Sequence, residues 1–171
     1  MKGMIDNSKG GARMHCQTAT VKDTEQLGFQ LGSFLRNLAK PLCIALVGDL
    51  GTGKTHFSQG VARGFGVTGE VTSPTFALMN TYETVAGTLY HFDVYRLEDE
   101  YELENIGFSE FTEDTLSLVE WADKFPEALP LEVLWITLTA EANGSRHSVW
   151  QTAELTEEEL LAIGGQYVFR D

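Results

Sequence analysis

The sequence predicts a three-layer α/β domain whose central sheet contains both parallel and antiparallel strands. Three observations predict this class. The apolar run 42–47 leads into a glycine-rich loop and then a helix. The segments 76–82 and 89–95 flank a short turn, which is typical of an antiparallel hairpin. Several alternating segments near the C-terminus extend the sheet, so helices and strands alternate along the chain as in α/β domains.

Composition limits the possible functions. The chain has 171 residues and a net charge of −13, from 12 Lys and Arg against 25 Asp and Glu. This length predicts one domain, since domains usually contain about 100–200 residues. The hydrophobic fraction of 43% excludes a disordered acidic chain. Broad nucleic-acid surfaces and docking sites for anionic membranes need clustered Lys and Arg, so the acidity argues against both.

The lack of a recognisable targeting signal and the small number of cysteines favour a cytoplasmic protein. No apolar run approaches the roughly 20 residues that a membrane-spanning helix needs. The first residues lack the apolar core of a secretory signal. Two cysteines, Cys16 and Cys43, are too few for a disulfide framework. We therefore expect a cytoplasmic protein without a membrane segment.

The first elements are predicted from polar and capping patterns. Residues 1–13 are small and polar, which predicts a disordered tail before a single domain over 14–171. A short strand is expected over 17–21. Asp23, with a glutamine three residues later, has the pattern of a helix N-cap. The apolar face of this helix continues until Pro41 ends it.

The later elements follow from apolar periodicity. The run 42–47 is apolar on both alternating faces, as expected of a central strand. The segment 97–106 has the pattern of an acidic helix, with Leu97 and Tyr101 directed inward. A short strand, a brief helix and three further strands complete the prediction, with the strands over 116–119, 131–139, 148–153 and 167–169.

The segment after strand 42–47 matches the complete nucleotide-binding P-loop pattern. It consists of Gly48, Asp49, Leu50, Gly51, Thr52, Gly53, Lys54 and Thr55. Glycines let consecutive N–H groups curve around a phosphate, and a helix directs its positive end at the same anion. The Lys54 ammonium suits the β- and γ-phosphates, and the Thr55 hydroxyl suits Mg²⁺. The alternative is a glycine-rich turn with a surface lysine, but the preceding strand and following helix favour a P-loop NTPase-like domain.

Hydrolysis also needs a carboxylate near Mg²⁺ and a group that orders water, and three segments contain candidates. Asp93 lies near the end of an apolar strand, either beside Mg²⁺ or on a solvent face. Glu120 leaves an apolar strand at the sheet edge where α/β folds bind ligands. Trp121 beside it is either a core residue or a platform for the base. The hydroxyls of Ser73 and Thr75, on a polar loop, suit Mg²⁺ or the γ-phosphate.

Four segments together resemble the TsaE (YjeE) family. They occur in order and with compatible spacing at 48–55, 73–76, 91–97 and 120–121, within a resemblance that covers residues 17–135. The resemblance implies the ATPase component of bacterial tRNA threonylcarbamoyladenosine biosynthesis, with ATP and Mg²⁺ as cofactors.

The resemblance also implies a role for each candidate residue. The catalytic residues would be Lys54, Asp93 and Glu120. The Mg²⁺ ligands would be Thr55, Asp93 and Glu120. Besides the loop 48–55, the nucleotide would meet Ser73 and Thr75 on a mobile, switch-like loop, Trp121, and the chain around Val21 near the adenine.

The implied partners are the proteins TsaD and TsaB, with tRNA reached only through that complex. ATP hydrolysis would reset the TsaD–TsaB assembly between turnovers. Arg63 and Arg96 are the only arginines between Lys54 and Glu120, so we expect slow hydrolysis alone and acceleration by a partner.

Three other functions are compatible with a nucleotide-binding loop. A small P-loop kinase usually has an arginine-rich lid, whereas six arginines are spread over this whole chain. A regulatory GTPase needs an Asn-Lys-x-Asp sequence, which does not occur. A regulatory module that binds ATP without hydrolysing it stays open as an alternative.

Overall fold

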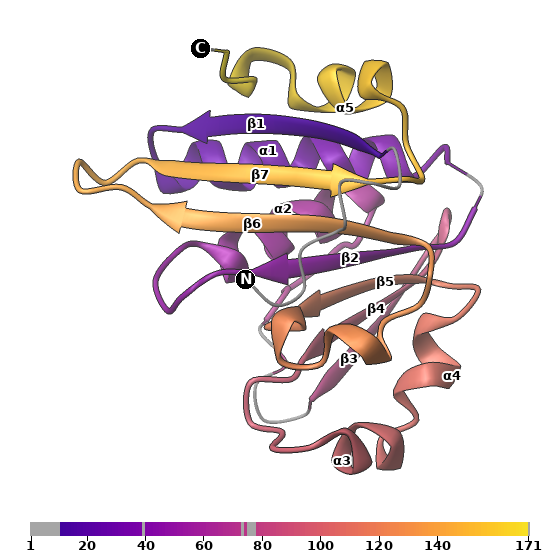
Figure 1. The fold of residues 1–171 in the computed structure, drawn as a ribbon. Helices are drawn as coiled ribbons and strands as arrows, with labels where there is room; N and C mark the ends of the chain where they lie inside the picture. The colour runs from indigo at the N-terminus through magenta and orange to yellow at the C-terminus, as the bar shows by residue number, and fades with distance from the viewer. Residues whose placement is uncertain (1–10, 39, 73, 75–77, 171) are drawn as a thin grey trace.

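The computed structural model describes residues 11–38, 40–72, 74 and 78–170. Within this part of the chain, seven strands form one mixed sheet, in the order β1-β7-β6-β2-β5-β4-β3 (Figure 1). The strands are β1 (Ala12–Thr18), β2 (Leu42–Val47), β3 (Met79–Thr84), β4 (Gly87–Asp93), β5 (Leu116–Glu120), β6 (Val133–Ala140) and β7 (Arg146–Thr152). The predicted α/β class with a mixed sheet is confirmed.

The centre of the sheet is parallel and its two sides are antiparallel. Strand β2 pairs in parallel with β5 and with β6, and β4 pairs in parallel with β5. The hairpin β3–β4 closes one side, and β7 and β1 extend the other side as antiparallel neighbours. Because β2, β4 and β5 run the same way, their carboxyl ends meet at one edge of the sheet.

Helices cover both faces of the sheet. Helices α1 (Val21–Leu35), α2 (Lys54–Phe65) and α5 (Glu157–Gly164) pack on one face, against Leu42, Ile44 and Leu46 of β2. The short helices α3 (Glu100–Asn105) and α4 (Phe108–Thr112) lie on the other face with two 3₁₀ turns, Ala122–Lys124 and Pro126–Ala128, near Cys43, Ala45 and Val47. The alternating side chains of β2 therefore enter two separate cores.

Helices α1 and α2 approach each other through glycines. A Cβ atom added at Gly60 of α2 would lie 2.0 Å from the carbonyl oxygen of Glu25, and one at Gly32 of α1 would lie 2.1 Å from that of Val61. Gly28 and Gly64 are equally constrained. Real Cβ atoms do not fit at such distances, so only glycine permits this contact between the two backbones. The start of α2 is thereby fixed against α1.

The N-terminal elements correct two predicted boundaries. Strand β1 begins at Ala12, two residues before the predicted start of the domain, and it replaces the strand expected over 17–21. The N-cap of α1 is Thr20, whereas Asp23 is the third helical residue and completes a capping box. The pattern that suggested an N-cap at Asp23 therefore belongs to a helix that begins one turn earlier. Residues 1–10 lie outside the described part of the chain.

The acidic and C-terminal segments contain three further differences. Leu97 is buried as predicted, but it precedes α3, which begins at Glu100; Tyr101 is exposed, and Leu103 is the buried residue of this helix. Helix α5 was not predicted, although Thr156 and Glu159 form a capping box at its start. The strand expected over 167–169 is a 3₁₀ turn followed by one isolated bridge, between Cys16 and Val168. No helix in the described residues is long and apolar enough to span a bilayer.

Candidate active site

The glycine-rich loop Gly48–Gly53 joins β2 to α2 at the carboxyl edge of the sheet. Gly51 and Gly53 have φ angles of 79° and 97°, in the left-handed region that L side chains rarely adopt. The Thr52 hydroxyl donates a hydrogen bond of 2.9 Å to the carbonyl of Asp49 and closes the loop on itself. The loop thus has the backbone conformation that presents N–H groups to an anion.

The first turn of α2 is open to a ligand. Helices α1, α3 and α5 begin with a Thr or Asp side chain that accepts a backbone N–H, whereas α2 begins at Gly53, and the five-residue α4 at Gly107, without a side-chain cap. The first N–H groups of a helix have no partner within the helix. At this position they suit an anion, and the positive end of the helix dipole reinforces that preference.

Lys54 is buried in the loop. Its side chain donates hydrogen bonds to the carbonyl of Gly48 and, at 2.7 Å, to that of Asp49, and the residue is only 6% exposed. Its Nζ lies 4.1 Å from the ring centroid of Trp121, a cation–π contact. Burial lowers the pKa of Lys54, and nearby carboxylates, Glu120 first among them, oppose that shift. The ammonium is therefore held between the loop and the carboxylates.

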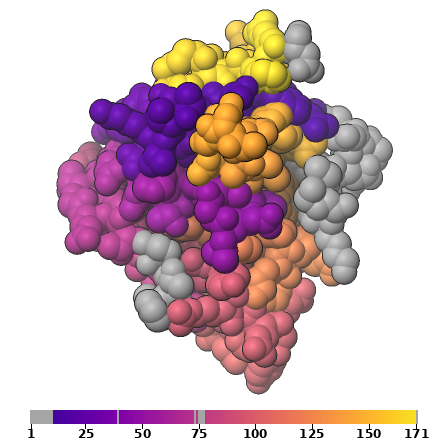
Figure 2. Space-filling model, turned by 90° about the vertical axis from the view of Figure 1, so that its left-hand side faces the viewer, coloured from indigo at the N-terminus to yellow at the C-terminus, as the bar shows by residue number. Residues whose placement is uncertain are grey.

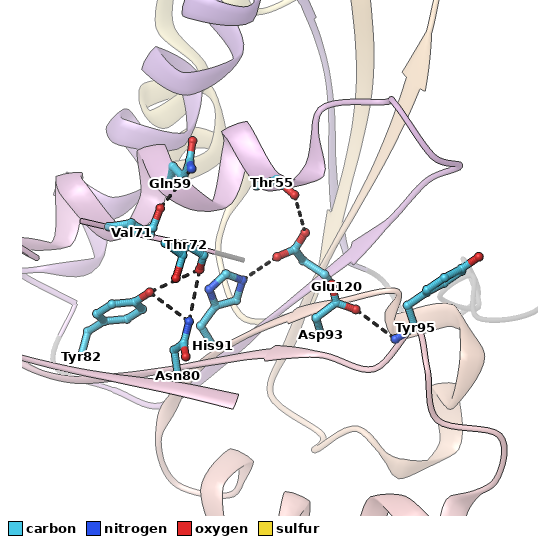
Figure 3. Close-up of polar contacts among 10 residues, drawn as sticks. All are labelled: Thr55, Gln59, Val71, Thr72, Asn80, Tyr82, His91, Asp93, Tyr95 and Glu120. Atoms are coloured by element: carbon cyan, nitrogen blue, oxygen red, sulfur yellow. Dashed lines mark hydrogen bonds and ion pairs between the residues drawn. The ribbon is translucent and has the colours of Figure 1, made fainter. Parts of the chain in front are cut away.

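The two predicted carboxylates lie side by side at the ends of neighbouring strands. Asp93 of β4 and Glu120 of β5 are direct partners in the parallel register, and both are buried. The Thr55 hydroxyl donates to Glu120 Oε1 at 3.3 Å, while Asp93 Oδ1 accepts the backbone N–H of Tyr95 at 3.0 Å (Figure 3). Glu120 is thus the carboxylate that bonds directly to the hydroxyl predicted to bind Mg²⁺.

Trp121 forms part of the site wall. It has a φ of 63°, which is uncommon for a bulky residue, and its ring centroid lies 4.6 Å from that of Tyr95. Residues held in such backbone conformations cluster at functional sites. Trp121 lines the cavity beside Lys54 and also packs against the core on the short-helix face, so its role as a platform for the base stays a prediction.

These residues line one cavity of about 480 Å³. Its lining comprises Val21, Thr24, Leu50, Gly51, Gly53, Lys54, Thr55, His56, Asp93, Tyr95, Glu120, Trp121 and Arg146. The remaining predicted loop residues are Gly48, Asp49 and Thr52, which make hydrogen bonds within the loop and to Lys54. Ser73 and Thr75 lie outside the described residues, so their predicted place on a switch-like loop stays a prediction.

The sequence patterns did not predict a role for two residues near this cavity, Arg146 and His91. Arg146 begins β7, and its guanidinium donates to the carbonyl of Gly51 at 3.1 Å. Arg146 lies after Glu120 in the sequence, outside the segment whose arginines were considered, and the pairing of β6 with β7 brings it to the loop. His91 of β4 lies 2.6 Å from Glu120 Oε2. Its alternation with Asp93 along one strand was the available sequence signal.

The donor set fits Mg²⁺ bound together with a phosphate. The described residues contain no group of three or more His, Cys, Asp or Glu side chains arranged to hold a metal ion by themselves. Mg²⁺ at phosphate sites does not need one, because it usually takes one or two carboxylates and completes its shell with phosphate oxygens and water. The adjacent Thr55 hydroxyl and Glu120 carboxylate suit that role.

Comparison with known proteins gives a family match. A family model described as "Threonylcarbamoyl adenosine biosynthesis protein TsaE" matches residues 18–148. The chain belongs to the TsaE family. That match includes the loop, both carboxylates, Trp121 and Arg146.

Individual TsaE proteins are similar over most of the chain. The tRNA threonylcarbamoyladenosine biosynthesis protein TsaE of Bacillus subtilis is 42% identical over 125 residues, which is 72% of each chain. The TsaE of Treponema pallidum is 37% identical over 134 residues, 78% of this chain and 96% of its own. A crystal structure of YdiB from Bacillus subtilis superposes with a TM-score of 0.66 at 30% identity, over 84% of this chain and 87% of that chain.

Proposed function

We propose that this TsaE-family chain is an Mg²⁺-dependent ATP hydrolase that acts as a switch in tRNA threonylcarbamoyladenosine biosynthesis. In this role it binds the TsaD–TsaB complex and resets that complex between turnovers, and tRNA is reached only through the complex. Family membership supports the pathway. The site geometry supports the chemistry.

One observation carries the proposal. The Thr55 hydroxyl on the first turn of α2 bonds to the Glu120 carboxylate, in the cavity that also contains the uncapped helix start and Lys54. A phosphate on the loop would therefore meet backbone N–H groups, an ammonium, a hydroxyl and a carboxylate at once. That combination serves phosphoryl transfer, where catalysis consists mainly of positioning and charge stabilisation.

Each site residue has a separate role in this proposal. Lys54 and the first N–H groups of α2 bind the phosphate oxygens and stabilise the charge that develops on them. Bound Mg²⁺ would supply positive charge that offsets the charge of the phosphates. Thr55 and Glu120 would hold the ion, with Asp93 beside them, and Glu120 orients the attacking water. Trp121 shields the Lys54 ammonium from solvent and leaves it directed into the loop.

Slow hydrolysis by the isolated chain is part of the proposal. Arg146 is the arginine that lines the cavity among the described residues, and its guanidinium already donates to the carbonyls of Gly51 and Gly144. A cation that stabilises the transferring phosphoryl group raises kcat by about 10³- to 10⁵-fold when supplied at the right place. A partner that supplies or reorients such a group would accelerate hydrolysis.

Steady-state ATP hydrolysis, measured with and without TsaB–TsaD, tests the proposal. We expect a low rate alone and a higher rate with the complex. Lys54→Ala should abolish hydrolysis through lost phosphate binding, and Lys40→Ala is the matched control, since Lys40 is exposed and contacts Glu154, which does not line the cavity. Full-rate hydrolysis by the isolated chain would refute the partner requirement, and normal hydrolysis by Lys54→Ala would refute the site. ATP retained without hydrolysis in any condition would instead identify a non-hydrolysing regulatory module.

A further inference from the structure

His91 is a buried histidine whose contact is with the carboxylate of the proposed site. It lies on β4, two residues before Asp93, and is 1% exposed. Its Nε2 is 2.6 Å from Glu120 Oε2, and both side chains are only 2% exposed. We infer that His91 is a positioning residue that holds the Glu120 carboxylate against Thr55. The inference rests on the proposed function only for the effect on hydrolysis.

The carboxylate of Glu120 is fixed from two sides. Oε2 is bound by His91, which belongs to the neighbouring strand β4, and Oε1 accepts the Thr55 hydroxyl from α2 (Figure 3). A glutamate side chain has several rotatable bonds, so one contact alone leaves the plane of the carboxylate free to turn. Two contacts from different elements define that plane, and with it the lone pairs directed into the cavity.

Burial makes this contact strong and selective. A hydrogen bond to an ionised carboxylate is about twice as strong as one between neutral groups, and water does not compete at a site this enclosed. Because a carboxylate only accepts hydrogen bonds, the proton of the imidazole must lie on Nε2. The other ring nitrogen, Nδ1, is buried and finds no hydrogen-bond partner among the described residues. Within the described part of the chain, the contact to Glu120 is therefore the one hydrogen bond of this ring.

The competing explanation is a histidine that merely fills the core. Leu89 precedes His91 on the same face of β4 and is fully buried in the core beneath α1 and α2. A histidine with only a packing role would occupy the same environment. The two explanations differ in which ring atom matters. Packing depends on the volume of the ring, whereas positioning depends on a donor at the place of Nε2.

The side chains of Gln and Asn distinguish these cases. The amide nitrogen of Gln takes the place of histidine Nε2, and that of Asn takes the place of Nδ1. We expect His91→Asn to lower kcat about 10- to 100-fold with the KM for ATP little changed. His91→Gln should lower kcat only about two- to threefold. Thermal unfolding of both variants measures the structural cost separately. Equal losses of kcat in two folded variants would overturn the inference.

A double variant tests whether His91 acts through Glu120. If it does, adding His91→Asn to Glu120→Gln should lower the single-turnover rate no further than Glu120→Gln alone. Two losses that multiply would show an effect independent of Glu120 and would overturn the inference.

A third readout needs neither ATP nor activity. Long-range ¹H–¹⁵N spectra of the ¹⁵N-histidine-labelled protein report which ring nitrogen is protonated. We expect the proton of His91 on Nε2, and His91→Gln identifies its signals. A proton on Nδ1 with Nε2 unprotonated would overturn the inference. If the wild-type chain fails to hydrolyse ATP under all conditions, the proposed function fails, while the position of this proton still decides the role of His91 toward Glu120.

Discussion

The helices on the two faces of the sheet pack in different ways. On one face, α1 and α2 contact each other through their backbones, and a methyl group at any of four glycines would collide with a carbonyl or amide of the opposite helix. On the other face, α3 and α4 have six and five residues and pack through side chains, as in the edge-to-face contact of Phe92 with Phe108 at 4.9 Å. The first contact permits a single geometry, and the second depends on which side chains are present.

The cavity lies where the two kinds of packing meet. Lys54 and Thr55 extend from α2, in the glycine-packed layer. Tyr95 and Trp121 follow β4 and β5 in the chain that leads to the short helices and 3₁₀ turns. Figure 2 shows the α1, α2 and loop region at the same face of the molecule as the segments that follow β4. The proposed phosphate contacts are thus placed by backbone packing, and the aromatic wall by side-chain packing.

The largest effect is expected where the glycine contact is broken. Gly60→Ala places a methyl group 2.0 Å from the carbonyl oxygen of Glu25, so α1 and α2 must separate. In an ordinary helix this change stabilises by about 0.5–1 kcal/mol, whereas here we expect a loss of about 3 kcal/mol. Urea unfolding measures it. Gln26→Ala, at an exposed position of α1, should change stability by less than about 0.5 kcal/mol.

A stable Gly60→Ala variant would mean that the two helices are not held by backbone contact. The comparison between the two layers would then fail. A destabilised variant that keeps its nucleotide affinity when folded would separate stability from site geometry within the same layer.

The second prediction concerns the carboxylate between the layers. Glu120→Gln keeps the size of the side chain and removes its charge, so we expect kcat for ATP to fall about 100-fold or more. The dissociation constant for ATP should change less than about threefold, because the loop and Lys54 bind the phosphates. Glu127→Gln, at an exposed residue of the second 3₁₀ turn, is the matched control. Unchanged kcat would remove Glu120 from the catalytic residues.

The parts of the site that are close together in the sequence were predicted, and the parts brought together only by the fold were not. The loop 48–55 is contiguous, so its pattern alone located it. Asp93 and Glu120 are 27 residues apart, yet both end strands that were predicted from apolar runs, and parallel strands present their ends at one edge. Arg146 reaches the loop only because β6 and β7 pair in a particular register, which no local pattern specifies.

The fold shows the same limit. Apolar periodicity located the central strands, whose burial on both faces leaves little choice of residue. It was wrong for 167–169, where an apolar segment crosses the edge strand β1 at a single bridge. It also missed α5, because three consecutive glutamates open that helix and obscure its apolar face. The glycines of α1 and α2 appear unfavourable by helix propensity, and only the contact between the helices explains them.

A smaller effect is expected at Arg146, which ties the loop to the β6–β7 hairpin. Arg146→Ala removes the hydrogen bond to the Gly51 carbonyl, so the loop should become less well ordered for its ligand. We expect the dissociation constants for ATP and ADP to rise about three- to tenfold, with little change in stability. Isothermal titration measures the two dissociation constants. Arg63→Ala, at an exposed position of α2, is the control. An unchanged affinity would show that the hairpin does not support the loop.

The smallest expected effect is a difference in how fast the two buried cysteines react with a thiol reagent, which compares the two cores. Cys16 lies in the core beneath α1 and α5, and Cys43 lies in the core beneath the short helices. Burial raises the pKa of each thiol to about 12. At pH 8 only about one buried thiol in 10,000 is then ionised, so neither should react with a thiol reagent until the protein opens.

Local opening sets the order of labelling. Cys16 is on β1 at the side of the sheet, and a Cβ atom added at Gly164 of α5 would lie 3.2 Å from its Sγ, so loss of α5 alone would uncover it. Cys43 lies on the central strand β2, which pairs on both sides with β5 and β6, and its thiol is uncovered only when the layer of short helices detaches from the middle of the sheet. We expect Cys16 to be labelled first, as followed by mass spectrometry at low urea. Earlier labelling of Cys43 would mean that the layer of short helices detaches before α5, and that side-chain packing on that face is the weakest contact with the sheet.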